Sequence, residues 1–413
     1  MSSAPSWHSA LAEIVGSESV AADDATLEAC AAQGVKPACV CTPGDVAQAA
    51  AAIKFAAERK IPVVPRGGGT AQGIGHAPPP EALTISTRRL GGTESPAHHG
   101  LQHEPADMVA TVPAGMALGA LQEALGKNGQ WLPLDGDAKA TVGGLIATDH
   151  SGPRALGYGT LRDMVLGMTI VNGDGVARKC GGKVVKNVTG YAMEKLYIGS
   201  LGTLGLITEV TVRLRPLPIG RRVWRIDAAN CRDCVAMIRA VAAKNLPLEA
   251  LRGSTTLPSD GTAAWPVLVS AAGTVAELGR IERELGAAIA PAEAKSVELP
   301  EGRGEEQALG TPNLRFWCSS ALLEPVLELI CVAQGRLDFG MNSGAAAFPL
   351  SAEQAAKISA TLVKLGANFR WENVQGLKIA EPFGPPRPEW ALMRQIKAAL
   401  DPQNIMNPGR FVV

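Results

Sequence analysis

The chain has 413 residues, of which 46% are hydrophobic and 19% are charged, and its 39 basic side chains equal its 39 acidic ones in number. This length suggests two or three domains, and the composition is that of a globular rather than a disordered protein. Because the formal net charge is zero, the chain as a whole has no attraction for nucleic acid or for an anionic membrane. The first residues show no signal peptide, and no apolar run reaches the roughly 18 residues that cross a bilayer. We therefore expect a cytoplasmic protein without a transmembrane segment, which partner proteins can hold at the inner membrane.

The first predicted elements lead into a run of glycines. Residues 42–60 predict a helix with Thr42 as its cap, Pro43 in its first turn and Asp45 near its positive end. Residues 61–65 predict a short buried strand, because they form a compact apolar run. This strand ends at the glycines 67–69.

The middle of the chain predicts mainly β-structure. A strand that ends at Pro113 is followed by a helix that stops at Asn128-Gly129. The glycine-rich region 141–215 predicts strands, the first of them at 141–147. Asn172–Gly175 lie between two strand-like runs, which is typical of a hairpin.

The remaining chain predicts a second module and a returning tail. The prolines and arginines of 215–222 indicate a domain exit. From about 223 to 375 strand-like and helix-like pieces alternate, which indicates an α+β module with an antiparallel sheet. A last helix ends before Pro402.

The cysteines indicate packing rather than a metal or a disulfide framework. Eight cysteines in a cytosolic chain of this length are typical of reduced thiols. Cys231 and Cys234 form a CxxC motif, but no second pair at ligand spacing accompanies it. We therefore expect no metal site and interpret both cysteines as packing residues of a helix.

The three glycines at 67–69 predict an anion site. Without Cβ atoms, successive N–H groups converge into a concave site for a phosphate or pyrophosphate, whereas a plain turn needs one or two glycines. A Walker loop requires Lys and then Ser or Thr after its last glycine, and this chain has Thr70 followed by Ala71-Gln72. A dinucleotide fingerprint requires a helix that starts within the glycines, which Pro78–Pro80 prevent.

Two further glycine clusters suggest that the ligand is long. One pairs Gly143-Gly144 with Ser151-Gly152, and the other places Gly199, Gly202 and Gly205 before a strand. Three glycine-rich approaches in one half of the chain imply a ligand contacted mostly through main chain. A flat aromatic cofactor on a pyrophosphate tether has this shape.

This arrangement resembles the FAD-binding domain of the vanillyl-alcohol oxidase/PCMH superfamily. That family combines an arginine–glycine loop after a strand with a later Thr-x-Gly-Gly and a Gly-Thr-x-Gly-x-x-Thr strand, which correspond here to 66–70, 141–144 and 202–208. More narrowly, the chain is similar to the FAD-binding subunit of bacterial glycolate oxidase over about residues 36–215 and 376–413. The stretches that carry this similarity are WLPLD, SGPRALGYGTLRDMVLGM, GGKVVKNVTGYAMEKLYIGSLGTLG and DPQNIMNPGR.

The resemblance implies an α+β fold of three parts. A two-subdomain PCMH-type FAD-binding domain covers 1–215. An α+β cap domain built on an antiparallel sheet covers 216–375, and the segment 376–413 returns to the FAD-binding domain.

The resemblance also implies the residues that hold FAD. The glycine loop would hold the pyrophosphate with Arg66 shaping it, a second group would line the cofactor up to its ring, Ile207 would pack near the adenine, and Asn407 would approach the ring. The implied set is Arg66, Gly67, Gly68, Gly69, Thr70, Thr141, Gly143, Gly144, Ser151, Gly152, Ile207 and Asn407. Many relatives bond the flavin covalently through a histidine in the first glycine loop. Thr70 occupies the place after the glycines, so noncovalent FAD is expected, with His76 and His150 as the nearest alternatives.

The sequence leaves the substrate site open. Oxidation of a 2-hydroxy acid requires a base, cations for the carboxylate and a hydride acceptor. Related dehydrogenases carry a histidine-rich segment in their later half, but the last of six histidines here is His150, so that family site is absent. Weak catalytic candidates are His150, Arg315, Arg370 and Lys378, with Glu372 beside them. The alternatives are a solvated sheet edge for the charged residues and a hydrogen-bonded loop residue for the histidine.

Three functions are therefore weighed. The first is the FAD-binding subunit of a glycolate oxidase complex, working with a companion FAD-linked subunit and an iron–sulfur subunit. The second is a self-sufficient FAD-dependent dehydrogenase of D-lactate or glycolate. The third is a flavin-free interaction module, against which the intact glycine loops count, because unused glycines only weaken a fold.

Overall fold

The computed structural model describes residues 4–90, 100–183, 190–257, 264–290, 292–297, 312–331, 335–374, 377 and 379–413. Its contacts divide the chain into two compact units. Unit 1 comprises Met1–His150, Leu161–Leu217 and Pro386–Val413, and unit 2 comprises Ser151–Thr160 and Pro218–Pro385. The domain boundaries expected after residues 215 and 375 stay a prediction.

The first sheet of unit 1 has four strands in the order β1-β2-β4-β3. β2, β4 and β3 are parallel, and β1 pairs antiparallel with β2. The elements of this subdomain are α1 (His8–Val15), β1 (Val20–Ala21), α2 (Asp24–Ala29), β2 (Cys39–Cys41), α3 (Val46–Arg59), β3 (Val63–Arg66) and β4 (Leu83–Ser86). The helix α3 buries Ala49, Ala52, Ile53, Phe55 and Ala56, so its small apolar face lies in a core that also includes α1 and the sheet.

The cap of α3 differs from the expected one. The Asp45 side chain accepts a hydrogen bond from the Gln48 N–H at 2.8 Å and so caps the helix, which begins at Val46. The Thr42 N–H instead donates to the carbonyl of Ser19, the residue before β1, at 2.8 Å. The prediction of Thr42 as the cap was therefore wrong.

The second subdomain of unit 1 is built on a five-stranded antiparallel sheet in the order β5-β6-β10-β8-β9. Its strands are β5 (Gln102–Glu104), β6 (Val109–Pro113), β8 (Val165–Val171), β9 (Ala177–Gly181) and β10 (Leu206–Arg213), and β7 (Gln130–Trp131) pairs separately with β11 (Arg215–Pro216). Its helices are α4 (Leu118–Gly126), α5 (Val142–Ala147), α7 (Leu161–Met164) and α8 (Glu194–Tyr197). The predicted hairpin at Asn172–Gly175 is confirmed, since β8 and β9 pair on either side of it.

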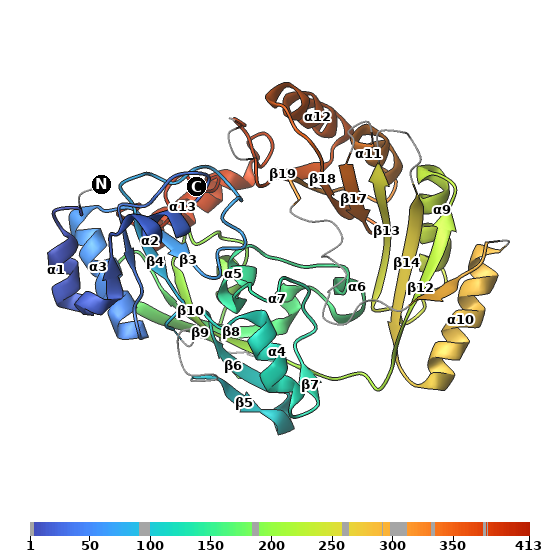
Figure 1. Cartoon of the computed structure of the whole chain (residues 1–413), viewed down its shortest axis with the longest axis horizontal. Helices are drawn as coiled ribbons and strands as arrows, with labels where there is room; N and C mark the ends of the chain where they lie inside the picture. The colour runs from blue at the N-terminus through green and yellow to red at the C-terminus, as the bar shows by residue number, and fades with distance from the viewer. Residues whose placement is uncertain are drawn as a thin grey trace. The chain divides into compact units, whose positions relative to one another are not determined.

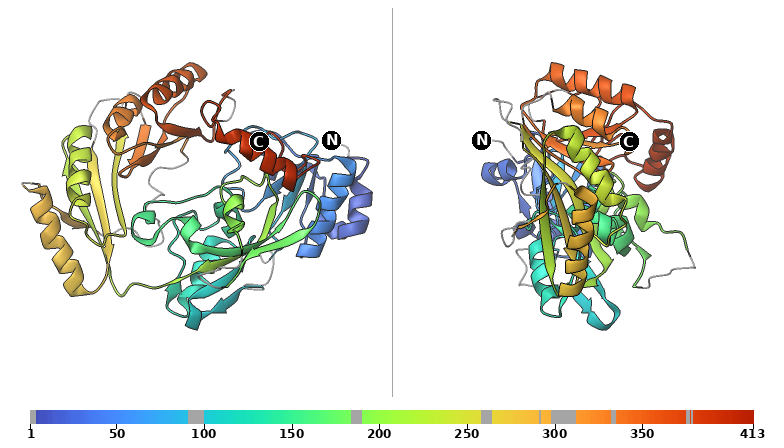
Figure 2. Two further views of the ribbon diagram at one scale, coloured as in Figure 1. Left: turned by 180° about the vertical axis from the view of Figure 1, so that it is seen from behind. Right: turned by 90° about the vertical axis from the view of Figure 1, so that its right-hand side faces the viewer.

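The C-terminal segment lies against the first sheet of unit 1. After α13 (Glu389–Leu400), Met406 bridges Val63 of β3, and the Asn407 N–H donates to the Val63 carbonyl at 2.7 Å. Figure 1 and the left view of Figure 2 show the red C-terminal segment beside the blue N-terminal part of the chain. This return brings residues 401–410 next to the glycines that follow β3.

Unit 2 is built on an eight-stranded antiparallel sheet in the order β15-β12-β14-β13-β17-β18-β16-β19. Its strands are β12 (Arg221–Ala228), β13 (Ala250–Leu257), β14 (Trp265–Ala272), β15 (Lys295–Val297), β16 (Leu314–Trp317), β17 (Gly335–Phe339), β18 (Ser343–Ala347) and β19 (Asn368–Trp371). The helices α9 (Cys231–Ala242), α10 (Val275–Ile289), α11 (Leu323–Ile330) and α12 (Ala352–Leu365) pack on one face of it (Figure 1), and the short α6 (Ala155–Tyr158) contacts β13. The expected α+β fold class, with two subdomains in one part and an antiparallel sheet in the other, is confirmed.

None of the helices in the described part of the chain is long and apolar enough to span a membrane.

Candidate cofactor pocket

A pocket in unit 1 collects most of the residues expected to hold a cofactor. It contains about 720 Å³ of empty space, part of it open to solvent. Four segments line it: the glycine loop after β3, the start of α5, the residues that lead into β10, and the C-terminal tail. The expected residues among its lining are Arg66, Gly67, Gly68, Gly69, Thr70, Thr141, Gly143, Gly144, Ile207 and Asn407.

The glycine loop presents backbone donors to this pocket. Among the described residues, the N–H groups of Gly67, Gly69 and Thr70 have no hydrogen-bond partner, and that of Gly68 makes one long bond, 3.4 Å, to the Thr141 hydroxyl. Unpaired backbone N–H groups in succession favour a bound anion, because an acceptor is needed to replace the water they lose.

The glycines are required by the surrounding protein as well. A Cβ on Gly67 would lie 2.0 Å from the Thr141 hydroxyl oxygen, and a Cβ on Gly68 would lie 2.3 Å from the Lys139 carbonyl oxygen. Gly69 has φ +80°, a left-handed backbone conformation that residues other than glycine rarely adopt. The absent side chains of Gly67 and Gly68 therefore face the segment 139–141, against which the loop packs tightly.

The segment 141–147 is a helix, so the predicted strand there was wrong. The Thr141 side chain caps α5 by accepting from the Gly144 N–H at 3.3 Å. Val142, Leu145 and Ile146 are buried at helical spacing, which explains why this short β-branched segment coils instead of extending. Thr141 thus has two functions, since it caps α5 and contacts the glycine loop.

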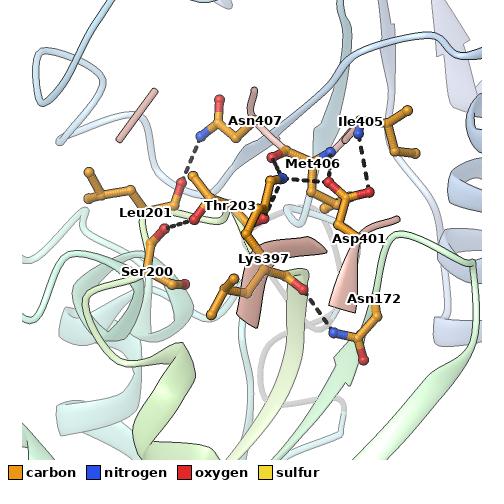
Figure 3. A network of polar contacts seen from close by, with 10 residues as sticks. Asn172, Ser200, Leu201, Thr203, Lys397, Asp401, Ile405, Met406 and Asn407 are labelled. Atoms are coloured by element: carbon orange, nitrogen blue, oxygen red, sulfur yellow. Dashed lines mark hydrogen bonds and ion pairs between the residues drawn. The ribbon is translucent and has the colours of Figure 1, made fainter. Parts of the chain in front are cut away.

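A buried ion pair fixes the C-terminal wall of the pocket. Lys397, which is 4% exposed, donates from Nζ to the Asp401 carboxylate at 2.5 Å and to the carbonyls of Thr203 and Met406 at 2.7 Å each. Asp401 also accepts the N–H groups of Ile405 and Met406. Figure 3 shows the Lys397 ammonium among these acceptors. Burial lowers the pKa of Lys397, against the opposing effect of Asp401.

Asn407 carries an acceptor that the protein leaves unused. Its Nδ2 donates to the Leu201 carbonyl at 2.7 Å (Figure 3), its side chain is 5% exposed, and its Oδ1 is buried without a partner. Because Asn407 lines the pocket, a ligand N–H or O–H is a suitable partner for this oxygen.

The charge of the pocket is positive. Among the described residues that line it, only Arg66 and Arg410 carry a formal charge. Burial lowers the pKa of both guanidinium groups, that of Arg410 to about 10. The Arg66 Nη2 donates to the Ala29 carbonyl at 2.7 Å, while its Nη1 is buried without a partner.

The structure does not bring every expected residue to this pocket. Ser151 and Gly152 belong to unit 2 and do not line it. Neither His76 nor His150, the alternatives for a covalent flavin link, lines it either. Lys378 lies outside the described residues.

Arg315 and Arg370, two of the catalytic candidates, share one buried carboxylate in unit 2. They are opposite each other on β16 and β19, and Glu372 accepts from both, at 3.1 Å from Arg315 Nε and 2.5 Å from Arg370 Nη2. Burial raises the pKa of Glu372, but the charges of Arg370 and Arg315 outweigh it, and the pKa is below its usual value. The expected alternative of a solvated sheet edge does not fit, because their side chains are only 20% and 14% exposed.

Sequence reasoning missed Arg410 and Leu201 as pocket residues. Arg410 lies three residues after Asn407 in the same tail motif, so its proximity to that candidate was a usable signal. Leu201 has φ +53° between two glycine positions, which nothing in the sequence indicates.

Comparisons with known proteins agree with this geometry. Residues 37–181 match the family "FAD binding domain", and residues 385–411 match "FAD linked oxidases, C-terminal domain". The chain is 29% identical to the D-lactate dehydrogenase of Archaeoglobus fulgidus over 90% of this chain and 91% of that protein. It is 27% identical to the glycolate oxidase subunit GlcD of Bacillus subtilis over 91% of this chain and 89% of that protein.

Solved structures share the fold. The 4-ethylphenol oxidase from Gulosibacter chungangensis superposes with a TM-score of 0.78 at 17% identity, over 97% of this chain and 95% of that one. Both family matches include pocket residues, since the first contains the glycine loop and α5 and the second contains Asn407 and Arg410. FAD is therefore the cofactor, and the unpaired amides, the two cations and the unused Asn407 oxygen fit its diphosphate and its hydrogen-bonding groups.

Proposed function

We propose that this chain, an FAD-linked oxidoreductase, takes part in the oxidation of glycolate to glyoxylate as the FAD-binding subunit of a glycolate oxidase complex. The observation that carries the proposal is the similarity, over about nine-tenths of the chain, to proteins named D-lactate dehydrogenase and glycolate oxidase subunit. Lactate and glycolate are both small 2-hydroxy acids, so the substrate class is common to the two relatives.

In this proposal the pocket of unit 1 holds FAD noncovalently. The N–H groups of Gly67, Gly69 and Thr70 bind the diphosphate, and Thr141 keeps the glycine loop in place through its contact with Gly68. Gly143 and Gly144 of α5 line the same pocket, Ile207 would lie near the adenine, and Asn407 would offer its Oδ1 to the ring. When bound, FAD supplies the acceptor for the two electrons of the alcohol.

The noncovalent link is supported by the position of the histidines. Thr70 follows the glycines where many relatives have the linking histidine, and neither His76 nor His150 lines the pocket. An acid-stable flavin–protein adduct would contradict this part of the proposal.

A role as one subunit of several is supported by the second half of the chain. After His150 the sequence has no histidine, and the candidate arginines Arg315 and Arg370 both pair with Glu372. General base chemistry on a hydroxyl group is most often done by histidine. A companion FAD-linked subunit would then oxidise glycolate, and an iron–sulfur subunit would carry electrons onward from the complex.

The match to a D-lactate dehydrogenase favours a second candidate, a self-sufficient D-2-hydroxy-acid dehydrogenase. In that case Arg315 and Arg370 would be the candidates that bind the substrate carboxylate. His150 or Lys378 would be the candidates for the base.

Anaerobic mixing separates the two candidates. The FAD-loaded chain is mixed with glycolate or D-lactate, with and without the partner subunits, and the visible absorbance of the flavin is followed. The subunit proposal expects bleaching only when the partners are present. Rapid bleaching of the isolated chain would overturn that role and establish the self-sufficient dehydrogenase.

A further inference from the structure

Arg410 is a buried cation for which the protein supplies no anion. Its side chain lines the pocket, and the residue is 3% exposed. Among the described residues it makes no ion pair, and burial is the cause of its lowered pKa. Burying a charge without a counter-charge destabilises a fold, so a fold that retains one is expected to use it.

The position of Arg410 links the C-terminal tail to the turn after the glycine loop. Its guanidinium donates to the carbonyls of Gln72 and His76, the latter at 2.7 Å, and the His76 N–H donates back to the Arg410 carbonyl at 3.2 Å. A guanidinium has five N–H donors in a planar fork, so these bonds leave donors available on the group.

The second cation of the pocket shows the same feature. Arg66 also makes no ion pair within the described chain, and its Nη1 has no hydrogen-bond partner. No aspartate or glutamate is among the described residues that line the pocket. The two arginines therefore give it a formal charge of +2. The diphosphate of FAD carries two negative charges at neutral pH, and a bidentate donor such as arginine suits its oxygens.

We propose that Arg410 is a diphosphate-binding residue, and that together with Arg66 it provides the positive charge that the cofactor neutralises. This deepens the proposed function and depends on it, because it assumes that FAD occupies the pocket of unit 1. One consequence is that FAD affinity requires the C-terminal tail as well as the glycine loop.

The test measures the dissociation constant of FAD for the reconstituted full chain as a function of salt and pH. Arg410→Gln is expected to weaken binding about 10- to 100-fold, the value of a hydrogen bond to a charged group, and to make the affinity less dependent on salt. Arg410→Lys is expected to restore most of the affinity at neutral pH. Its affinity should then fall as the pH rises toward the pKa of a buried lysine, whereas the wild-type affinity stays level over that range.

The control is Arg394→Gln, which removes an exposed cation of α13 outside the pocket and should leave the affinity unchanged. A wild-type chain that binds no FAD would refute the proposed function itself. If the wild type binds FAD and Arg410→Gln binds it equally well, or loses affinity with an unchanged salt dependence and no rescue by lysine, the assignment of Arg410 is wrong.

Discussion

Gly68 illustrates how one backbone position joins packing to function. A Cβ added at this residue would lie 2.3 Å from the Lys139 carbonyl oxygen, which is too close for a non-bonded contact. A side chain at this position would therefore push the loop away from the segment 139–141 before it met any ligand. The unpaired N–H groups of the same loop depend on that close approach.

We predict that Gly68→Val abolishes FAD retention. The cause is displacement of the loop from Lys139, because the β-branched side chain has no space on that side. The measurement is the flavin-to-protein ratio after gel filtration, combined with circular dichroism to show that the chain has folded. The matched control is Gly126→Ala, since a Cβ there meets nothing within 4 Å; it should keep its flavin. A folded Gly68→Val protein with a full flavin content would refute the loop assignment.

The cysteines of α9 give a second prediction at this scale. Cys234 is fully buried, and burial raises its pKa to about 12, as expected for an inert packing thiol. The double substitution Cys231→Ser and Cys234→Ser should lower the melting temperature, because a hydroxyl replaces a buried thiol, and should leave the flavin content unchanged. Elemental analysis checks the interpretation: a metal present in the wild type and lost from the double variant would contradict it.

A helix cap and a buried ion pair, Lys397–Asp401, fix two of the elements that surround the pocket. Thr141 caps α5, and Lys397 connects α13 to the carbonyls of Thr203 and Met406. Asp401, 1% exposed, also lies against the β8–β9 hairpin, where a Cβ on Gly173 would come within 2.2 Å of its Oδ1. The tail that carries Asn407 and Arg410 is thus fixed from two sides.

Replacing Lys397 with Met should destabilise unit 1 by about 3–5 kcal/mol, because it leaves Asp401 as an uncompensated buried charge. FAD affinity should fall with it, since Asn407 loses its support. Urea unfolding measures the first effect and FAD titration the second. Arg394→Met, an exposed change on the same helix, serves as the reference. Equal stability of the two variants would show that the Lys397–Asp401 pair does not hold the tail.

At the scale of the whole molecule, unit 2 depends on a buried carboxylate. Glu249, 3% exposed, accepts from Arg221 at 2.6 and 2.9 Å, from the Tyr158 hydroxyl at 2.6 Å and from Ser270 at 3.0 Å. Tyr158 comes from the segment Ser151–Thr160, so this carboxylate binds that segment to the sheet of unit 2. Burial acts to raise the pKa of Glu249, but the hydrogen bonds from Arg221 and Tyr158 outweigh it, and the pKa is lowered.

This lowered pKa predicts the acid stability of unit 2. A carboxyl group whose pKa is lower in the folded than in the unfolded state stabilises the fold above its unfolded pKa, near 4.5, and loses that contribution as the pH falls through the folded value. Glu249→Gln should therefore cost roughly 1.5 to 3 kcal/mol at neutral pH, the value of hydrogen bonds to a charged group, and flatten the decline in unfolding free energy below about pH 4.5. Glu284→Gln, in an exposed pair with Arg280, is the control and should change little. If the unfolding free energy of Glu249→Gln fell with decreasing pH as steeply as that of the wild type, Glu249 would not be the carboxylate that stabilises unit 2.

Features that are encoded within a few neighbouring residues could be predicted from the sequence, whereas features that depend on distant contacts could not. The Asn172–Gly175 hairpin and the leucine-marked helix α4 were predictable, because their turn residues and apolar spacing are encoded within a few positions. The helix α5 (Val142–Ala147) was missed although its Thr141 cap is local, because a short apolar run fits a buried strand as well as a buried helix. Arg410 was missed although it follows the candidate Asn407 by three residues, because the carbonyls that it contacts belong to the distant 72–76 turn.

The central claim is that the amides of the glycine loop bind the diphosphate of FAD. The most direct test is an experimental structure of the FAD complex. We predict diphosphate oxygens within hydrogen-bond distance, about 3 Å, of the N–H groups of Gly67, Gly69 and Thr70. FAD bound elsewhere on the chain, with these three amides still unpaired, would contradict the account.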